Sequence, residues 1–174
     1  MIALTLRAVL FTVLVPGTLT VWLPFYVFDG SRAVRYPLGW VPIAAGATLY
    51  FWCAAEFLLN GHGTPNIFFA RALRFAIGVE PQQLVRASIY RYSRNPMYLG
   101  VVTVLLGEAL LCGSWARLAY AGGMGLIFQA VVVWIEEPHL RQNRGAAYLE
   151  YCRNVPRWIP WPSASSQSVR GTTL

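Results

Sequence analysis

The chain has 174 residues, of which 56% are hydrophobic and only 12% are charged, and its mean hydropathy is +0.47. A soluble domain carries about twice that share of charged residues, so the composition excludes an ordinary soluble protein and indicates an integral membrane protein. All fourteen basic residues are arginine and the net charge is +7, but the arginines are scattered between apolar runs, so we expect contacts with membrane lipids and not with nucleic acid.

The first half of the chain predicts two membrane spans and a long polar loop. The apolar run from Ala8 to Phe28 is long enough to cross a bilayer, and Pro16-Gly17 inside it predicts a kink. A second apolar run extends from Leu38 to Leu59. The arginine-rich loop from Asn60 to Arg94 follows, and its residues 66–78 predict a short helix in the headgroup region.

The second half predicts a membrane hairpin. Tyr98 to Cys112 is the third span, and Gly113-Ser114 leaves almost no connection before the fourth span, Trp115 to Ile135. These two helices must therefore run antiparallel. A polar amphipathic helix from Pro138 to Arg153 comes next, and the proline-rich stretch Val155 to Pro162 cannot be helical.

These spans predict an all-α polytopic membrane protein with a single domain, residues 1–162, and a disordered tail, residues 163–174. With four spans, the N-terminus, the long loop and the amphipathic helix share one side of the membrane. That side holds the arginines at 7, 71, 74, 86, 91, 94, 141, 144, 153, 157 and 170, and the other side holds those at 32, 35 and 117. Because positive charge favours the cytoplasm, we predict a protein of the bacterial inner membrane with both termini cytoplasmic.

The start of the third span is a chemically distinct element. Asn95 is a favourable N-cap whose side chain can accept from N–H groups of the first turn, and Pro96 suits the first helical position. Because the hairpin brings its two outer ends together at about 8–10 Å, Asn95 to Tyr98 should face Glu136 and Glu137.

Such a site joins a helix N-terminus, which favours an anion, to two carboxylates, which favour a cation. A zwitterion with an additional positive centre would suit it. Adjacent side chains on a helix point about 100° apart, so we expect Glu136 to face inward and Glu137 to have a supporting or arginine-pairing role. The alternative is that the two glutamates simply end a membrane helix at the interface.

Four ordered motifs resemble those of the isoprenylcysteine carboxyl methyltransferase and phospholipid methyltransferase family of integral membrane proteins. They are Arg94-Asn95-Pro96-Met97-Tyr98-Leu99-Gly100, Glu136-Glu137-x-x-Leu140, Gly145-x-x-Tyr148-x-x-Tyr151 and Val155-Pro156-Arg157-Trp158-Ile159-Pro160. The similarity extends upstream to Gly61-x-Gly63-Thr64-Pro65 and Leu84-Val85, and covers about the last two thirds of the chain.

The resemblance implies methyl transfer from S-adenosylmethionine to a lipid-like or small amphiphilic acceptor, a carboxylate or an amine, without a metal. It implies cofactor contacts at Gln82, Gln83, Leu84, Val85, Tyr90, Arg94, Asn95, Pro96, Met97, Tyr98, Gly100 and Glu136, with Glu136 binding the polar end of the cofactor. Glu136 and Glu137 are the candidate catalytic residues, and Glu137 or water would take the proton from an amine acceptor. The prenylcysteine-specific members of this family resemble one another in having arginine at the position of Val132. The valine in this chain therefore argues against a prenylcysteine acceptor.

Two other functions stay open: a sterol-type reductase that binds NADPH, and a membrane scaffold without catalysis. Among the remaining residues, we expect Glu108 to make a structural hydrogen bond, and Glu56 is placed where it could border an acceptor pocket. We expect Tyr148 and Tyr151 to pack the last helix over the site. The glycines 122, 123 and 125 predict close packing of the fourth span, and Arg141, Arg144, Arg153 and Arg157 are expected to face headgroups.

Overall fold

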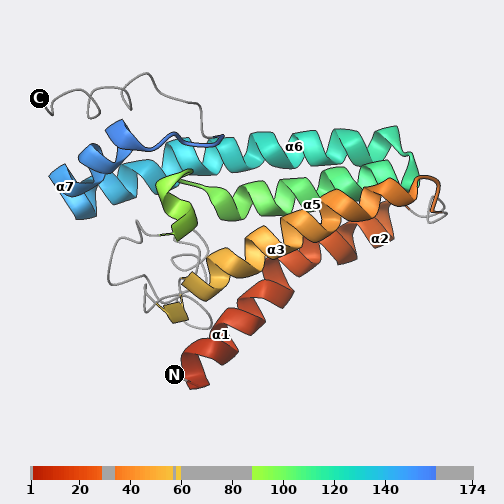
Figure 1. Ribbon diagram of the computed structural model, residues 1–174, viewed down its shortest axis with the longest axis horizontal. Helices are drawn as coiled ribbons and strands as arrows, with labels where there is room; N and C mark the ends of the chain where they lie inside the picture. The colour runs from red at the N-terminus through yellow and green to blue at the C-terminus, as the bar shows by residue number, and fades with distance from the viewer. Residues whose placement is uncertain (1, 29–33, 57, 60–87, 160–174) are drawn as a thin grey trace, which may run out of the picture.

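The computed structural model describes residues 2–28, 34–56, 58–59 and 88–159 (Figure 1). Three predictions fall outside these residues: the headgroup helix at 66–78, the cofactor contacts Gln82 to Val85, and the disordered tail at 163–174.

The described chain is a set of long helices. Their bounds are α1 Ile2–Thr12, η1 Val13–Trp22, α2 Leu23–Val27, η2 Pro37–Gly39, α3 Trp40–Glu56, η4 Ser88–Arg91, α5 Pro96–Cys112, α6 Trp115–Val131, η5 Val132–Glu136 and α7 Glu137–Asn154. Three continuous stretches are long and apolar enough to cross a membrane, Thr5–Val27, Pro37–Glu56 and Trp115–Asn154, and α5 is apolar but shorter. The predicted all-α polytopic membrane fold is confirmed.

Helix α5 lies between α3 and α6 along the length of the molecule (Figure 1). It begins at Pro96, as predicted, and ends at Cys112. The next residue, Gly113, has a φ of 60°, the left-handed conformation that glycine adopts readily. Ser114 then caps α6 by accepting from the backbone N–H of Arg117, and the two helices form the predicted antiparallel hairpin. The start of α1, the end of α3, the start of α5 and α7 therefore lie at one end of the bundle.

Close packing of η2 and α3 against α5 depends on glycine pairs at matching heights. A Cβ atom on Gly46 would lie 2.5 Å from the carbonyl oxygen of Gly100, and one on Gly39 would lie 2.6 Å from that of Gly107. Any side chain at these positions would push the two backbones apart.

The glycines that were expected to pack the fourth span do not do so. At Gly122, Gly123 and Gly125 a Cβ atom would meet no atom of another described element within 4 Å. The prediction of close packing there is wrong for the described residues, because this face of α6 does not meet α5.

Two helical segments have wide π turns. In η1 the turn accommodates Pro16, whose carbonyl oxygen accepts from the Thr20 hydroxyl at 2.8 Å. In η5 the N–H of Glu137 donates to the carbonyl of Val132, so α6 continues into α7 without a break. The predicted polar helix is present as α7, but it bends at Gly145, where φ is 50° and ψ −131°, and its second half turns away from the first (Figure 1).

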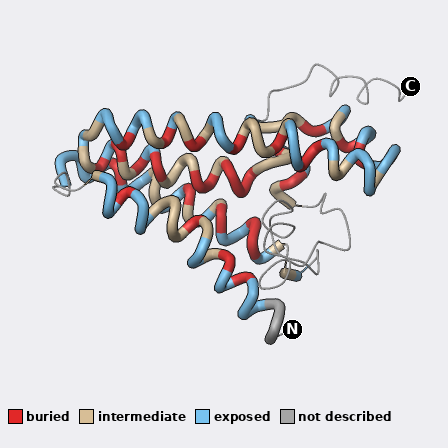
Figure 2. Tube along the Cα trace, turned by 180° about the vertical axis from the view of Figure 1, so that it is seen from behind, coloured by how far each residue is buried: buried red, intermediate tan, exposed pale blue. Residues whose placement is uncertain are grey.

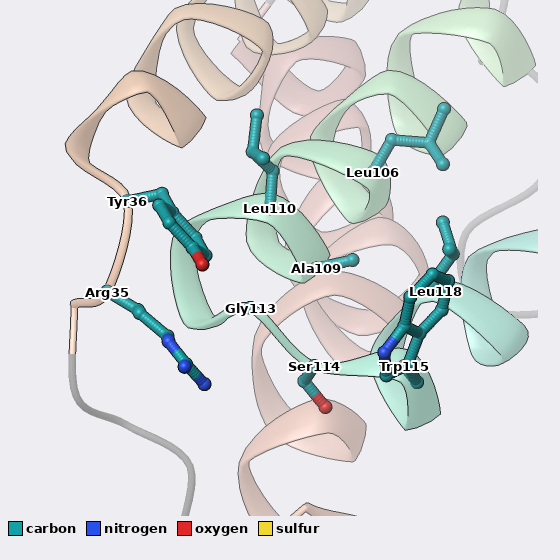
Figure 3. A pocket seen from close by; sticks show the side chains of 9 residues that line it. All are labelled: Arg35, Tyr36, Leu106, Ala109, Leu110, Gly113, Ser114, Trp115 and Leu118. Carbon is teal, nitrogen blue, oxygen red and sulfur yellow. The ribbon is translucent and has the colours of Figure 1, made fainter.

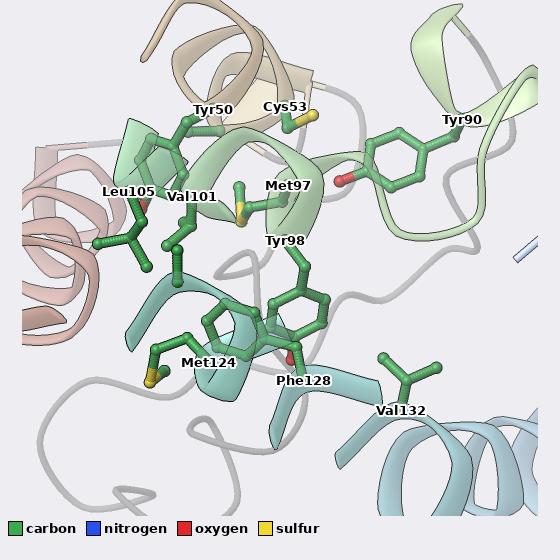
Figure 4. Packing of buried hydrophobic residues seen from close by; sticks show 12 residues of the cluster. Tyr50, Cys53, Tyr90, Met97, Tyr98, Val101, Leu105, Met124, Phe128 and Val132 are labelled. Carbon is green, nitrogen blue, oxygen red and sulfur yellow. The ribbon is translucent and has the colours of Figure 1, made fainter. Parts of the chain in front are cut away.

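Buried residues form a stripe where the helices meet (Figure 2), and many large apolar residues are exposed on the outer faces. That pattern suits helices whose outer surface contacts lipid. The main core cluster joins α3, α5 and α6, and Figure 4 shows Tyr98 of α5 packed beside Phe128 of α6. The core thus holds the start of α5 in place beneath the candidate site.

Candidate functional site

Asn95 is the N-cap residue of α5, but its side chain does not cap the helix. Its backbone is non-helical, with φ −130° and ψ 48°, and it makes no side-chain capping hydrogen bond. Instead, Nδ2 of Asn95 donates to the carbonyl of Arg157 at 3.0 Å. The prediction of a capping bond is therefore wrong, because the amide of Asn95 binds a backbone carbonyl 62 residues further along the chain.

Tyr98 and Glu136 form the centre of the site. The Tyr98 hydroxyl donates to Oε1 of Glu136 at 2.7 Å, and both side chains are buried. The Tyr98 ring packs against Phe128 at 4.7 Å and edge-on against Trp158 at 6.4 Å between ring centroids. The predicted approach of Glu136 to the start of α5 is confirmed, and its partner is a tyrosine whose ring packs against two other aromatic side chains.

Glu137 points into a cluster of three arginines. Arg157 donates twice, from Nε to Oε1 at 2.7 Å and from Nη2 to Oε2 at 3.1 Å. Arg94 Nη1 donates to Oε1 at 3.0 Å, and Arg141 Nη2 to Oε2 at 3.3 Å. Burial would raise the pKa of Glu137, but the hydrogen bonds from Arg157 and the charges of the three arginines outweigh it and lower that pKa.

One of these arginines does not lie where the sequence predicts it. Arg157 turns inward to Glu137, so the expectation that it faces headgroups is wrong, whereas Arg141 also pairs with Glu137 but stays largely exposed. Arg94 is nearly buried; its Nη1 also contacts Sγ of Cys152 at 2.9 Å, and its Nε has no partner among the described residues. An unpartnered buried donor costs free energy, so an acceptor that reached Nε would stabilise this arginine.

Residues 155–159, here called the C-terminal strap, cross over the start of α5. The backbone N–H of Arg94 donates to Pro156 at 3.0 Å, and Nε1 of Trp158 donates to Oε1 of Gln129 on α6 at 2.6 Å. This segment is non-helical, as its prolines predict. The strap holds Trp158 against Tyr98 and closes one side of the site.

The second half of α7 packs on the other side. The Tyr151 hydroxyl donates to the carbonyl of Tyr90 at 2.6 Å, and Tyr148 and Tyr151 are both buried, as predicted. Burial, followed by the nearby Cys53, raises the pKa of Tyr90 well above its ordinary value. Tyr90 is therefore neutral and acts through its ring and its hydrogen bonds.

The structure thus brings together Arg94, Asn95, Tyr98, Glu136 and Glu137, all of which the sequence singles out. Two further candidates, Met97 and Gly100, point elsewhere: Met97 packs in the core with α3, and Gly100 meets the α3 backbone. Pro96 is fully buried at the start of α5.

Sequence reasoning missed Gln129 and gave Trp158 no separate role. A hydrogen-bonding amide within an apolar span was the available signal for Gln129. For Glu108 the structure shows an ion pair in place of the expected structural hydrogen bond, since its Oε2 lies 3.6 Å from Nη1 of Arg117 across the hairpin.

The charged and aromatic groups of the site fit a zwitterion that carries a further cationic centre. The buried Glu136 carboxylate suits an ammonium group, and the unpartnered Nε of Arg94 beside the uncapped start of α5 suits a carboxylate. The faces of Tyr98 and Trp158 suit a cation or a flat ring. S-adenosylmethionine has these three features.

Comparison with known proteins gives a consistent result. A family model described as phospholipid methyltransferase matches residues 34–146. Protein-S-isoprenylcysteine O-methyltransferases B and A of Arabidopsis thaliana are 30% and 31% identical over 83 residues, 47% of this chain and 42% of each relative. The match therefore spans less than half the length of these curated relatives, and no solved structure matches significantly. The family model covers more than half of the chain and includes α3, α5, α6 and the Glu136-Glu137 pair, so the chain belongs to the phospholipid methyltransferase family of membrane methyltransferases.

Proposed function

We propose that this protein transfers a methyl group from S-adenosylmethionine to a lipid-like acceptor at the membrane surface. The observation that carries the proposal is the buried Glu136 carboxylate, which accepts from Tyr98 in the first turn of α5, a turn that has no side-chain cap. Arg94, two residues before this helix, keeps an unpartnered Nε. Family membership supports methyl transfer as the reaction class.

In this proposal each polar group has a separate part of the cofactor to bind. Glu136 binds the ammonium group, Arg94 Nε and the first turn of α5 bind the carboxylate, and the rings of Tyr98 and Trp158 contact the sulfonium or the adenine. When bound, S-adenosylmethionine supplies a methyl group that is already activated on sulfur. The chain then needs only to align the acceptor with that methyl group and to exclude water.

Glu137 has a positioning role in this account. Its two oxygens hold Arg157, and Arg157 belongs to the C-terminal strap that carries Trp158 over Tyr98. A carboxylate with a lowered pKa and three arginine partners is a weak base, so a proton from an amine acceptor passes to water rather than to Glu137.

The surroundings of the site favour a lipid-like acceptor. Val132, one turn before Glu136, is buried and apolar, so it offers no cation to an acceptor carboxylate. Beside Tyr98, a cavity of about 20 Å³ lies between the first span and α5 and is lined by apolar side chains that include Pro16 and Phe128. We propose that the hydrocarbon part of the acceptor enters here when the first span moves aside. The Arabidopsis relatives act on isoprenylcysteine by name, and Val132 argues against that acceptor in this chain.

We also propose that the site faces the cytoplasm of a bacterial inner membrane. At this end of the described chain lie the arginines 7, 91, 94, 141, 144, 153 and 157, and at the other end lie 35 and 117. The excess of arginine at the end that carries the site supports this orientation.

The test is a transfer assay with purified full-length protein, tritiated S-adenosylmethionine and a lipid extract as acceptor. We expect tritium in the organic phase, and mild base treatment then separates the acceptor classes, because a methyl ester is hydrolysed and an N-methyl group is not. The matched variants are Glu136→Gln, expected to lose transfer, and Glu150→Gln, an exposed carboxylate on α7 expected to keep it. Failure of the wild-type protein to label any lipid would refute the proposal.

A further inference from the structure

A second cavity lies at the opposite end of the bundle from the candidate site. It has a volume of about 400 Å³ and opens beside the turn at Gly113 and Ser114 that joins α5 to α6 (Figure 3). We call it the turn-side groove. Its volume lies within the range of about 300–1,000 Å³ typical of ligand pockets.

One wall of the turn-side groove is apolar. It is formed by Leu106 and Leu110 of α5 and Leu118 of α6, each about two fifths exposed. These side chains lie within the membrane-crossing part of the hairpin, so lipid acyl chains are the apolar molecules that surround them.

The other wall is polar and lies at the end of the span. Trp115, 83% exposed, and Tyr36 supply rings of the kind that gather at membrane interfaces. Arg35 is held there because its backbone N–H donates to Leu111 at 2.8 Å and its side chain packs over Gly113, where a Cβ would lie only 2.9 Å from Arg35 Cδ.

The charge of Arg35 is not neutralised within the described part of the chain. Its guanidinium lies 5.8 Å from the centre of the Tyr36 ring, and no described carboxylate is within ion-pair distance. Arg117, the other described arginine at this end, pairs with Glu108. Near the end of α5, the carbonyl groups of Ala109, Leu110 and Leu111 already accept from backbone N–H groups, and Leu111 accepts from both Arg35 and Tyr36. The guanidinium of Arg35 therefore remains available to an external anion.

We propose that the turn-side groove binds one anionic phospholipid of the leaflet opposite the candidate site. The phosphate binds Arg35 next to the first turn of α6, whose dipole favours an anion, and one acyl chain follows Leu110 and Leu118 along the groove. The charge on Arg35 and the apolar wall below it together select a molecule with an acidic headgroup and a hydrocarbon tail. This site is independent of methyl transfer.

The test measures lipid binding to the full-length protein in detergent micelles by native mass spectrometry. Phosphatidylglycerol and phosphatidylcholine with identical acyl chains are the two probes. We expect the wild-type protein to retain one phosphatidylglycerol with a preference on the order of tenfold, the contribution of one charge-assisted hydrogen bond. Arg35→Gln should lose the preference, and Arg153→Gln, an exposed arginine on α7, should keep it.

A second variant guards against misfolding of Arg35→Gln. Leu118→Trp fills the groove from a partly exposed helix surface without changing charge, and it should also lose the bound phosphatidylglycerol. Equal binding of the two lipids by the wild-type protein, or an unchanged preference in both variants, would overturn the proposal. If the wild-type protein formed dimers without retaining lipid, and these dimers were absent in Leu118→Trp, the groove would bind a second copy of the chain and not a phospholipid.

Discussion

The substitution Glu137→Gln removes the charge that holds three arginines together. Glutamine keeps one carbonyl oxygen but places an amide N–H₂ group where an oxygen now accepts from Arg157 and Arg141. The main loss falls on Arg94, because its side chain is only 11% exposed whereas those of Arg157 and Arg141 are 32% and 55% exposed. Once Glu137 is replaced, water can solvate the charges of Arg157 and Arg141, but it cannot reach the charge of Arg94.

Breaking a buried ion pair typically costs about 3–5 kcal/mol, and the exposure of two of the three partners places this site at the lower end, about 3 kcal/mol. In a chain of this length that corresponds to a decrease in Tm of roughly 6–12 °C. The assay is thermal unfolding in detergent, followed by intrinsic tryptophan fluorescence at one fixed scan rate, since membrane proteins often unfold irreversibly.

Glu150→Gln is the matched control, because Glu150 is an exposed carboxylate on the same helix. A double-mutant cycle with Arg157→Gln adds a direct measure of coupling: once Glu137 is glutamine, the second substitution should cost much less than it does alone. If Glu137→Gln and Glu150→Gln had the same Tm, Glu137 would not anchor the C-terminal strap.

Three further predictions follow from the same structure. In the folded protein the pKa of Glu137 lies below its ordinary value of 4.5, so the stabilisation by its ion pairs is present above about pH 4.5 and is lost as the pH falls through the folded pKa. The Tm of the wild-type protein should therefore fall more steeply in this range than the Tm of Glu137→Gln. Parallel curves of Tm against pH would contradict this prediction. Gly46→Ala should lower the Tm by the equivalent of about 1–3 kcal/mol, since its Cβ would lie 2.5 Å from a backbone oxygen of α5. The control Gly122→Ala should leave the Tm unchanged or raise it, because no atom of another described element lies within 4 Å of that Cβ. Equal effects of the two substitutions would show that Gly46 is not needed for the packing of α3 on α5. Trp158→Phe keeps a ring against Tyr98 but removes the hydrogen bond to Gln129, so proteolysis within residues 155–159 should become faster in a time course on gels, and an unchanged rate would show that this bond does not hold the strap.

Much of the fold follows from local sequence patterns. The helix start at Pro96 and the hairpin at Gly113-Ser114 depend on residues within a few positions, and the structure has both. The approach of Glu136 to Tyr98 follows from helix lengths once the hairpin is given, so it was also predictable.

The errors concern contacts between segments far apart in the chain. The local sequence predicts a capping role for Asn95 and a headgroup-facing Arg157, because nothing local shows that the C-terminal strap folds back over α5. A cluster of glycines, such as 122, 123 and 125, does not reveal which face of a helix meets a neighbour, whereas Gly46 and Gly100 are isolated in sequence and meet only in the folded bundle.

The most direct test of the central claim is isothermal titration of the purified full-length protein with S-adenosylmethionine and, separately, with NADPH. We predict binding of S-adenosylmethionine, no binding of NADPH, and an affinity for S-adenosylmethionine at least about tenfold weaker in Glu136→Gln than in Glu150→Gln, because a charge-assisted hydrogen bond to a buried carboxylate is lost. Binding of NADPH alone would contradict the methyltransferase account in favour of a reductase, binding of neither would favour a scaffold, and equal affinities in the two variants would remove the role given to Glu136.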